Sequence, residues 1–356
     1  MSKHKILFAS SLKPAFDTRT EKLFLSFINK KKYECHFCGV KSTGHKNIHS
    51  WKYNRGLLFR LWINLRFFYL LILIKPQTII INNTDLAHLS IIYQSFNKTQ
   101  LIFDIQENQI NNIIYQQVYT GLKKSLLLLL TNLTNSSLKK HCSGFILAEK
   151  CYKEELTFIK NKPFLILENK AHPCLKPRRN QQTSVPLQLL FSGTISLTSG
   201  VLNATNWLKE INNIVPCSLT IIGHSPNKQL HKQLTTDAAT DQNITYLGSL
   251  SPIPHFEIEK EIAKADFGLI CYELTTANKN KTPTKLYEYL AAHLPIICQD
   301  HTLWNDLISI NQAGLNYSEL IKTKQVSRDF HNNQSTNFAQ WNEQLLTKWF
   351  DEILIK

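Results

Sequence analysis

Short apolar runs alternate with segments of helical length along most of the chain. The runs are three to five residues long, rich in β-branched and aromatic residues, and bounded by polar or turn-forming positions. Those predicted to be strands are Ile6–Ala9, Ile79–Ile81, Leu101–Phe103, Phe145–Ala148, Leu165–Leu167, Gln188–Ser192, Ser218–Ile222, Ile244–Leu247, Phe267–Cys271 and Pro295–Cys298. Segments of about 12–20 residues separate most of them, which indicates parallel sheets covered by helices on both faces.

A polar, proline-bearing stretch divides this α/β alternation into two similar halves. We predict an N-terminal domain over residues 1–168, a linker over 169–186, a second domain over 187–334 and a C-terminal helix within 335–356. Each domain is expected to be doubly wound and Rossmann-like, and the two are expected to face a cleft. Ligands of such sheets bind beyond the carboxyl ends of the strands.

Composition narrows the class of protein. The chain has 356 residues, of which 43% are hydrophobic, so two domains can each bury a core and a disordered protein is excluded. Eight scattered cysteines and the lack of a secretory leader argue against a disulfide scaffold, and a reducing cytoplasm is expected. Cys35 and Cys38 form a single C-x-x-C without a second pair, so a zinc site is not expected.

The charge of the chain is one-sided. Residues 1–165 hold 24 Lys and Arg against 9 Asp and Glu, whereas residues 166–356 hold 17 of each, so the first half carries the whole net charge of +15. This excess of positive charge suggests an anionic partner for the first half of the chain, either a membrane surface or a nucleic acid. The basic residues lack the interleaved aromatics of a stacking platform, which argues against nucleic acid.

The most apolar stretch, residues 57–74, does not predict a membrane span. It contains Arg60, Asn64 and Arg66, and an arginine near the centre of a bilayer costs roughly 2.5–3.5 kcal/mol. The favoured interpretation is a helix that leads into the strand at 79–81, and the alternative is a helix lying on a membrane surface with its aromatic residues at the interface.

The segment from Thr282 to Cys298 has the strongest signature of a binding site. Thr282 is predicted to be the N-cap and Pro283 the first residue of a helix that follows a strand and loop. The helix N-terminus favours an anion, and Lys285 in its first turn favours a phosphate. Glu288, three residues on, can accept hydrogen bonds from a ribose. The alternative is a capped helix with an i,i+3 Lys–Glu surface pair.

This segment resembles the nucleotide-binding signature S-P-x-K-hydrophobic-x-E-Y-hydrophobic-A of the GT-B glycosyltransferases of the "group 1" class (family 4). The similarity covers most of the chain. The other segments that resemble the family are Leu190–Gly200, Leu219–His224, Ile244–Ser249, Asp266–Ile270, Leu101–Asn108, Phe145–Leu156 and Leu167–Asn169.

The resemblance implies a GT-B fold in which the second domain binds a nucleotide-activated sugar. Lys285 would contact the diphosphate and Glu288 the ribose, and residues 335–356 would cross back to the N-terminal, acceptor-binding domain. The residues expected to bind the nucleotide sugar are Gly193, Thr194, Gly223, Tyr246, Leu247, Gly248, Thr282, Pro283, Thr284, Lys285, Leu286 and Glu288. There is no D-x-D motif, so neither a metal nor another cofactor is expected, and Lys285 would stabilise the leaving diphosphate.

In the first domain, Asp104 and Glu107 are candidate catalytic carboxylates, because both follow a predicted strand. Asp17 and Arg19 follow the first strand and are candidates for binding the acceptor. For each pair the alternative is a structural ion pair. The chain departs from the family pattern in three respects: Asn280 replaces the first glutamate of E-x7-E, Gln106 replaces a histidine, and Thr194, Ser196, Thr198 and Ser199 occupy the loop where relatives carry Arg and Lys.

The sequence therefore predicts a glycosyltransferase of the hexosyltransferase type. It would move a sugar from a nucleoside diphosphate sugar to a glycan or lipid-linked acceptor, with retention, in cell-surface polysaccharide synthesis. The expected place is the cytoplasm, with peripheral attachment to the inner face of the cell membrane through the basic N-terminal domain. The alternatives are a sugar-nucleotide epimerase or hydrolase of the same fold, an inactive homologue, and a basic nucleic-acid-binding protein.

Overall fold

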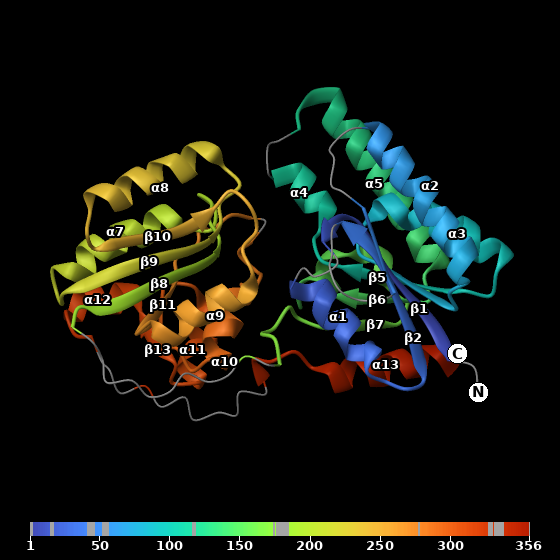
Figure 1. The fold of residues 1–356 in the computed structure, drawn as a ribbon. Helices are drawn as coiled ribbons and strands as arrows, with labels where there is room; N and C mark the ends of the chain where they lie inside the picture. The colour runs from blue at the N-terminus through green and yellow to red at the C-terminus, as the bar shows by residue number, and fades with distance from the viewer. Residues whose placement is uncertain are drawn as a thin grey trace. The chain divides into compact units, whose positions relative to one another are not determined.

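The structure is a computed structural model that describes residues 3–14, 18–40, 47–51, 57–115, 119–173, 175, 185–276, 278–326, 330 and 338–355. The chain divides into two compact units (Figure 1). The first comprises Met1–Asn169 and Asn342–Lys356, and the second comprises Lys170–Trp341.

The first unit is built on a seven-stranded parallel sheet with the order β3-β2-β1-β4-β5-β6-β7. Its strands are β1 (His4–Pro14), β2 (Tyr33–Val40), β3 (Ile48–Trp51), β4 (Thr78–Ile81), β5 (Gln100–Ile105), β6 (Gly144–Leu147) and β7 (Phe164–Ile166). The five strands predicted in this half are confirmed, whereas β2 and β3 were not predicted. Neither β2 nor β3 is rich in Val and Ile, as buried strands usually are. In β2, Cys, His and Glu occupy several of the positions.

Helices cover both faces of this sheet. Successive side chains of β1 point to opposite faces: Phe8 contacts Phe24 and Phe27 of α1 (Thr18–Ile28), and the Phe27 ring lies 4.8 Å from that of Phe350 in α13 (Glu343–Ile355). Leu7 and Ala9 belong to the core of the other face, which α2 (Leu57–Ile74), α3 (Ala87–Phe96) and α5 (Gly121–His141) cover. The smaller elements are η1 (Thr84–Leu86), α4 (Gln109–Tyr115), α6 (Tyr152–Glu155) and η2 (Thr157–Ile159).

The prediction for residues 57–74 is confirmed, since α2 spans Leu57–Ile74 and leads into β4. The C-terminal prediction is refined, because α13 begins only at Glu343. It packs within the first unit against α1. In the described part of the chain, no helix combines the length and apolarity needed to cross a membrane.

The second unit contains a six-stranded parallel sheet with the order β10-β9-β8-β11-β12-β13. The strands are β8 (Leu187–Thr194), β9 (Cys217–His224), β10 (Ile244–Ser249), β11 (Phe267–Ile270), β12 (Ile296–Cys298) and β13 (Gly314–Asn316). One face packs on α9 (His255–Lys264), α10 (Thr284–Ala291) and α11 (Thr302–Ile310). The other packs on α7 (Val201–Asn212), α8 (Lys228–Thr240) and α12 (Tyr317–Thr323).

Both sheets have the strand order of a doubly wound fold, so the predicted fold class of two Rossmann-like domains is confirmed. In the second unit the chain runs outward from β8 through β9 to β10, then returns to β11 on the other side of β8. The order therefore reverses between β8 and β11. Ligands bind to such sheets at this switch point, beyond the carboxyl ends of the strands.

Candidate functional site

The helix α10 begins at the switch point of the second sheet. It follows β11, and its first turn carries Lys285. The prediction that Thr282 caps this helix is wrong, because the helix starts at Thr284 and Pro283 is the N-cap. Pro283 has φ −60° and ψ 137°, an extended conformation that keeps it and Thr282 outside the helix.

Lys285 is buried without a hydrogen-bond partner. Lys285 is only 4% exposed, and its Nζ lies 3.8 Å from the ring centroid of Phe191 in β8 and 4.6 Å from that of Tyr272. Burial lowers the pKa of Lys285 to about 8, and the nearby Cys271 and Glu288 oppose that shift. The i,i+3 surface pair that the sequence left open is therefore excluded for this lysine.

A buried ammonium group of this kind is poised for an anion. Three N–H groups need acceptors, and the ring faces supply only cation–π attraction. Buried polar groups without partners are uncommon and call for an explanation such as an unbound ligand. The N–H groups in the first turn of α10 add positive potential at the same place. A phosphate group meets both requirements.

Tyr289 fixes α10 against the strand that carries Phe191. Its hydroxyl lies 2.8 Å from Ser192 Oγ and accepts a hydrogen bond from Ser192 N at 3.2 Å. The ring packs so closely over Gly268 that a Cβ there would approach it to 2.4 Å. These contacts set the position of the helix, and with it the position of Lys285.

The loop after β8 meets the end of β11 through close backbone contacts. Gly200 has φ 83°, and a Cβ there would lie 1.7 Å from Cys271 O. A Cβ on Gly223 would lie 1.7 Å from Gly193 O, so glycine is needed where β8 and β9 end. Thr194 is exposed at the end of β8. These strand ends, which the resemblance assigned to the nucleotide sugar, thus lie together at one edge of the sheet.

Hydroxyl groups close the loop that follows Thr194. Ser196 N donates to Ser199 Oγ at 2.9 Å, and Ser199 N donates to Ser196 Oγ at 3.1 Å. Glu273 N donates to Thr198 O at 3.2 Å, which ties this loop to the segment after β11. The loop thus keeps a defined conformation without the Arg and Lys of the family pattern.

Glu288 shares a histidine with a second carboxylate. His255 Nε2 lies 3.6 Å from Glu288 Oε1 and 3.7 Å from Glu259 Oε1. The side chain of Glu288 is 10% exposed, whereas that of Glu259 is 33% exposed. Leu286, between Lys285 and Glu288, is fully buried in the core and serves to pack the helix.

The end of β10 lies two strands from β8. The hydroxyl of Tyr246 lies 2.9 Å from His231 Nδ1, and a Cβ on Gly248 would lie 2.3 Å from the Tyr246 ring. Leu247 is 43% exposed. These residues form an ordered edge, but the structure brings none of them into a described contact with Lys285 or Glu288.

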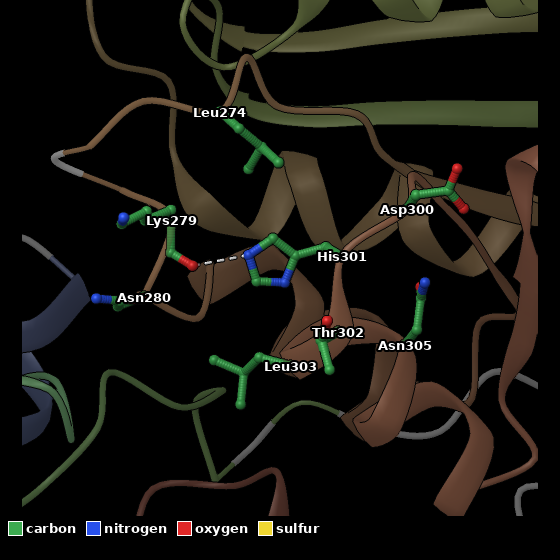
Figure 2. A pocket seen from close by; sticks show the side chains of 8 residues that line it. All are labelled: Leu274, Lys279, Asn280, Asp300, His301, Thr302, Leu303 and Asn305. Atoms are coloured by element: carbon green, nitrogen blue, oxygen red, sulfur yellow. Dashed lines mark hydrogen bonds between the residues drawn. The ribbon is translucent and has the colours of Figure 1, made fainter.

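A pocket of about 760 Å³ opens where the loop after β11 faces the start of α11 (Figure 2). His301 caps α11, and its Nε2 bonds to Lys279 O at 2.8 Å, the dashed line in Figure 2. The ring of His301 stacks on Trp304, whose Nε1 donates to Lys281 O at 2.8 Å. Six of the eight lining residues are polar, and the lining comprises Leu274, Lys279, Asn280, Asp300, His301, Thr302, Leu303 and Asn305.

In the first unit, Arg19 and Asp104 form a buried ion pair. Arg19 Nη2 lies 2.6 Å from Asp104 Oδ1, Nε donates to both carboxylate oxygens, and Nη1 donates to Leu167 O at 2.7 Å. Gln106 Nε2 also donates to Asp104 at 2.8 Å. Arg19 is 3% exposed and Asp104 is fully buried, so each satisfies the other rather than facing solvent.

Of the other two candidates in this unit, the structure describes only Glu107, which is not part of that pair. Glu107 is exposed and accepts a hydrogen bond from Asn112 Nδ2 at 2.8 Å. Asp17 lies outside the described residues. Among the side chains that the structure describes, no group of three or more His, Cys, Asp or Glu could hold a metal ion.

Three residues of the site were not found by sequence reasoning. Phe191 and Tyr272 are the rings that face Lys285, and His255 neighbours Glu288. Phe191 lies within β8 and Tyr272 lies two residues after β11, the two strands that flank the switch point, so an aromatic residue near the carboxyl end of each strand was the available signal. His255 lies in a helix that nothing in the sequence links to Glu288.

Residues 196–355 match the sequence family described as glucosyltransferase 3-like, C-terminal domain. Among curated proteins, no sequence matches the chain significantly. A sucrose-phosphate synthase from Thermosynechococcus elongatus has a similar structure, with a TM-score of 0.72 at 11% identity over 99% of this chain and 100% of that one. A glycosyltransferase from Rickettsia africae gives 0.65 at 13% identity, covering 99% of each chain. Anabaena HepE in complex with UDP-glucose gives 0.62 at 11% identity, covering 99% of this chain and 100% of that one.

The two doubly wound sheets and these neighbours define the class: this protein has the GT-B fold. Within that class, residues 196–355 are similar to the glucosyltransferase 3-like C-terminal domain. The predicted resemblance to GT-B glycosyltransferases is confirmed for the fold.

Proposed function

We propose that this protein is a glycosyltransferase that takes its sugar from a nucleoside diphosphate sugar bound to the second unit. The observation that carries the proposal is the buried, unpartnered ammonium of Lys285 at the switch point of the sheet. Lys285 and the first turn of α10 would bind the diphosphate and stabilise its charge as the sugar leaves. Glu288, one turn further along α10, would accept hydrogen bonds from the ribose.

The donor that we propose first is a UDP-hexose, with glucose as the sugar. The family name is glucosyltransferase 3-like, and the similar HepE was crystallised with UDP-glucose. Gly193, Thr194 and Gly223 would approach the phosphates, and Tyr246, Leu247 and Gly248 would border the base. The pocket that contains Asn280 has the size of small-molecule sites, and its six polar side chains suit sugar hydroxyls.

For the acceptor we propose a glycan or a lipid-linked glycan of the cell surface, with retention of configuration and without a metal. These details rest on the resemblance to the "group 1" class. Transfer is tested by incubating the protein with UDP-glucose and candidate acceptors and following UDP release. NMR of the anomeric proton in the product then separates retention from inversion.

Nucleotide binding is testable by thermal shift with UDP, GDP, dTDP, CMP and ADP. We expect UDP to stabilise the protein, by about 2.7 kcal/mol at a hundred times its dissociation constant. Glu288→Gln should weaken the binding about tenfold or more, because a hydrogen bond to a charged group contributes roughly 1.5–3 kcal/mol.

The matched control is Glu259→Gln, which removes the other carboxylate beside His255 and leaves Glu288 in place. It should bind UDP like the wild type. Equal losses in the two variants would show that Glu288 acts only through His255. If none of the five nucleotides stabilised the protein, the proposed site would be refuted.

The affinity for UDP should fall as the pH rises through about 8. Below that pH Lys285 is protonated and attracts the diphosphate, and above it the charged fraction drops about tenfold per pH unit. Because bound phosphate raises the pKa of Lys285, binding above pH 8 should take up a proton. Calorimetry in buffers of different ionisation enthalpy measures that uptake. An affinity that stays constant up to the ordinary lysine pKa of 10.5 would contradict the assignment.

A second candidate function is epimerisation of a UDP-sugar. A structure described as a UDP-N-acetylglucosamine 2-epimerase from Listeria monocytogenes covers 99% of this chain with a TM-score of 0.58. Incubation with UDP-N-acetylglucosamine and no acceptor separates the two functions. Appearance of the 2-epimer would establish the epimerase, whereas acceptor-dependent release of UDP supports transfer.

A further inference from the structure

Two helices of the first unit expose continuous apolar stripes. On α2 the exposed large side chains follow helical spacing and are between 43% and 81% accessible: Leu58, Leu61, Trp62, Leu65, Tyr69, Ile72 and Leu73. On α5 they are between 50% and 91% accessible: Leu122, Leu126, Leu129, Leu130 and Leu133. Monomeric proteins rarely expose contiguous apolar surface on this scale, and such surface marks an interaction site.

The two stripes lie on the same layer of the unit. The inner sides of α2, α3 and α5 pack in one core against one face of the sheet. The helix α3 contacts both of the others, and it exposes Ile92 and, at 85%, Phe96. Figure 1 shows these three helices on one side of the sheet. We call their exposed outer side the α2–α5 surface.

The α2–α5 surface is basic as well as apolar. The three helices contain six Lys and Arg, namely Arg60, Arg66, Lys123, Lys124, Lys139 and Lys140, and no Asp or Glu. The Arg66 guanidinium lies 5.2 Å from the ring of Trp62. Asp85, between α2 and α3, lies 3.9 Å from Arg60.

A small hollow of about 190 Å³ opens between the ends of α2 and α3. Apolar side chains, among them Ile72 and Phe96, form most of its wall, and Lys75 and Asn97 lie at it. An apolar recess beside a lysine suits a lipid, since acyl carbon enters the recess while the anionic headgroup meets the ammonium.

We propose that the α2–α5 surface docks the protein on a bilayer that contains anionic lipid. A second copy of this chain fits the surface less well, because two faces with the same positive charge would repel each other. Nucleic acid also fits the surface less well, because proteins that bind single strands stack the bases on aromatic side chains, whereas this surface exposes rows of leucine. An anionic bilayer satisfies both features, since its interface takes up leucine and tryptophan side chains and its headgroups neutralise lysine and arginine.

The test is flotation of the full-length protein, without nucleotide, with two kinds of vesicle. One is phosphatidylcholine alone and the other is equal parts phosphatidylcholine and phosphatidylglycerol. We expect strong binding to the second kind only, and weaker binding at high salt. Leu126→Gln/Leu129→Gln/Leu133→Gln should lower the partition coefficient about a hundredfold, since three half-exposed leucines lose their burial in the interface. Lys123→Gln/Lys140→Gln should lower it about thirtyfold.

Matched controls change the same residue types elsewhere. Ile310→Gln/Leu345→Gln/Ile355→Gln alters exposed helical positions outside the surface, and Lys228→Gln/Lys232→Gln removes the same charge from the second unit. Both controls should bind vesicles like the wild type. The proposal is overturned if the wild type floats with neither vesicle, or if the controls lose as much binding as the surface variants. It is also overturned if the wild type self-associates in sedimentation and the leucine variant does not. Because no nucleotide is present, these outcomes are independent of the proposed donor site.

Discussion

Replacing Lys285 with methionine should weaken UDP binding about a hundredfold or more while leaving the unliganded protein at least as stable as the wild type. The loss follows from the contacts proposed for the ammonium, since removing one partner of a buried, hydrogen-bonded charge pair costs about 2–5 kcal/mol. Methionine is unbranched and fills irregular apolar space, so it suits the site between the rings of Phe191 and Tyr272.

The expected gain in stability comes from the cost of burying the charge. Burial moves the pKa of Lys285 from 10.5 to about 8, which corresponds to as much as about 3 kcal/mol at neutral pH. In the wild type, the unfolded chain holds this proton up to pH 10.5 whereas the folded chain releases it near pH 8. The free energy of unfolding therefore rises with pH between these values, and Lys285→Met should abolish that rise.

Chemical unfolding at neutral pH and at a pH between 8 and 10.5, with and without UDP, measures both effects. Lys232→Met, at an exposed position of the same unit, is the control and should change neither UDP binding nor the pH dependence. A Lys285→Met protein that bound UDP like the wild type would refute the diphosphate assignment. One that unfolded more easily at neutral pH would show that the lysine is structural.

The fold could be predicted from the sequence because the main signal of such a fold, the alternation of short apolar runs with helical segments, is local. Buried parallel strands such as β4 and β11 are short apolar runs, and the helices between them have a fixed length range. The strand β2 was missed for the same reason. Its buried positions include Cys35, Phe37 and Cys38, and only its pairing with both β1 and β3 makes it an inner strand.

The site was predicted in part. The motif around Lys285 marked the correct helix. The burial of Lys285, however, depends on Phe191, which lies 94 positions earlier in the chain and is close only because β8 neighbours β11. Local spacing at Lys285 and Glu288 fits a surface pair equally well. The helical spacing of the apolar residues also gave no indication that Pro283 would remain extended.

The interpretation of Asp104 likewise depends on a residue that is far away in the sequence. Its place after a strand was compatible with a catalytic carboxylate or with a structural ion pair. The structure brings it to Arg19, 85 positions away, and buries both. A carboxylate that accepts four hydrogen bonds from Arg19 and Gln106 has little freedom left to orient an acceptor.

We therefore expect Asp104→Leu to destabilise the first unit by about 3–5 kcal/mol, because it leaves the Arg19 guanidinium buried without a counter-charge. Arg19→Met should cost a similar amount, since Asp104 then lacks its main partner. The double variant should recover most of the loss, because an ion pair replaced by packed apolar side chains is often neutral. Urea unfolding of the four proteins, followed by a signal from the first unit such as Trp51 fluorescence, completes the double-mutant cycle.

The cycle also separates the structural role from the catalytic one. A structural pair predicts that the double variant regains stability and, with it, transfer activity. A catalytic carboxylate predicts the opposite, since Asp104→Asn would lose turnover with little change in unfolding, and the double variant would be stable but inactive. Lys32 and Asp351, an exposed pair 2.6 Å apart in the same unit, provide the comparison: breaking that pair should cost no more than about 1 kcal/mol. Equal costs for the two pairs would contradict the buried, coupled arrangement of Arg19 and Asp104.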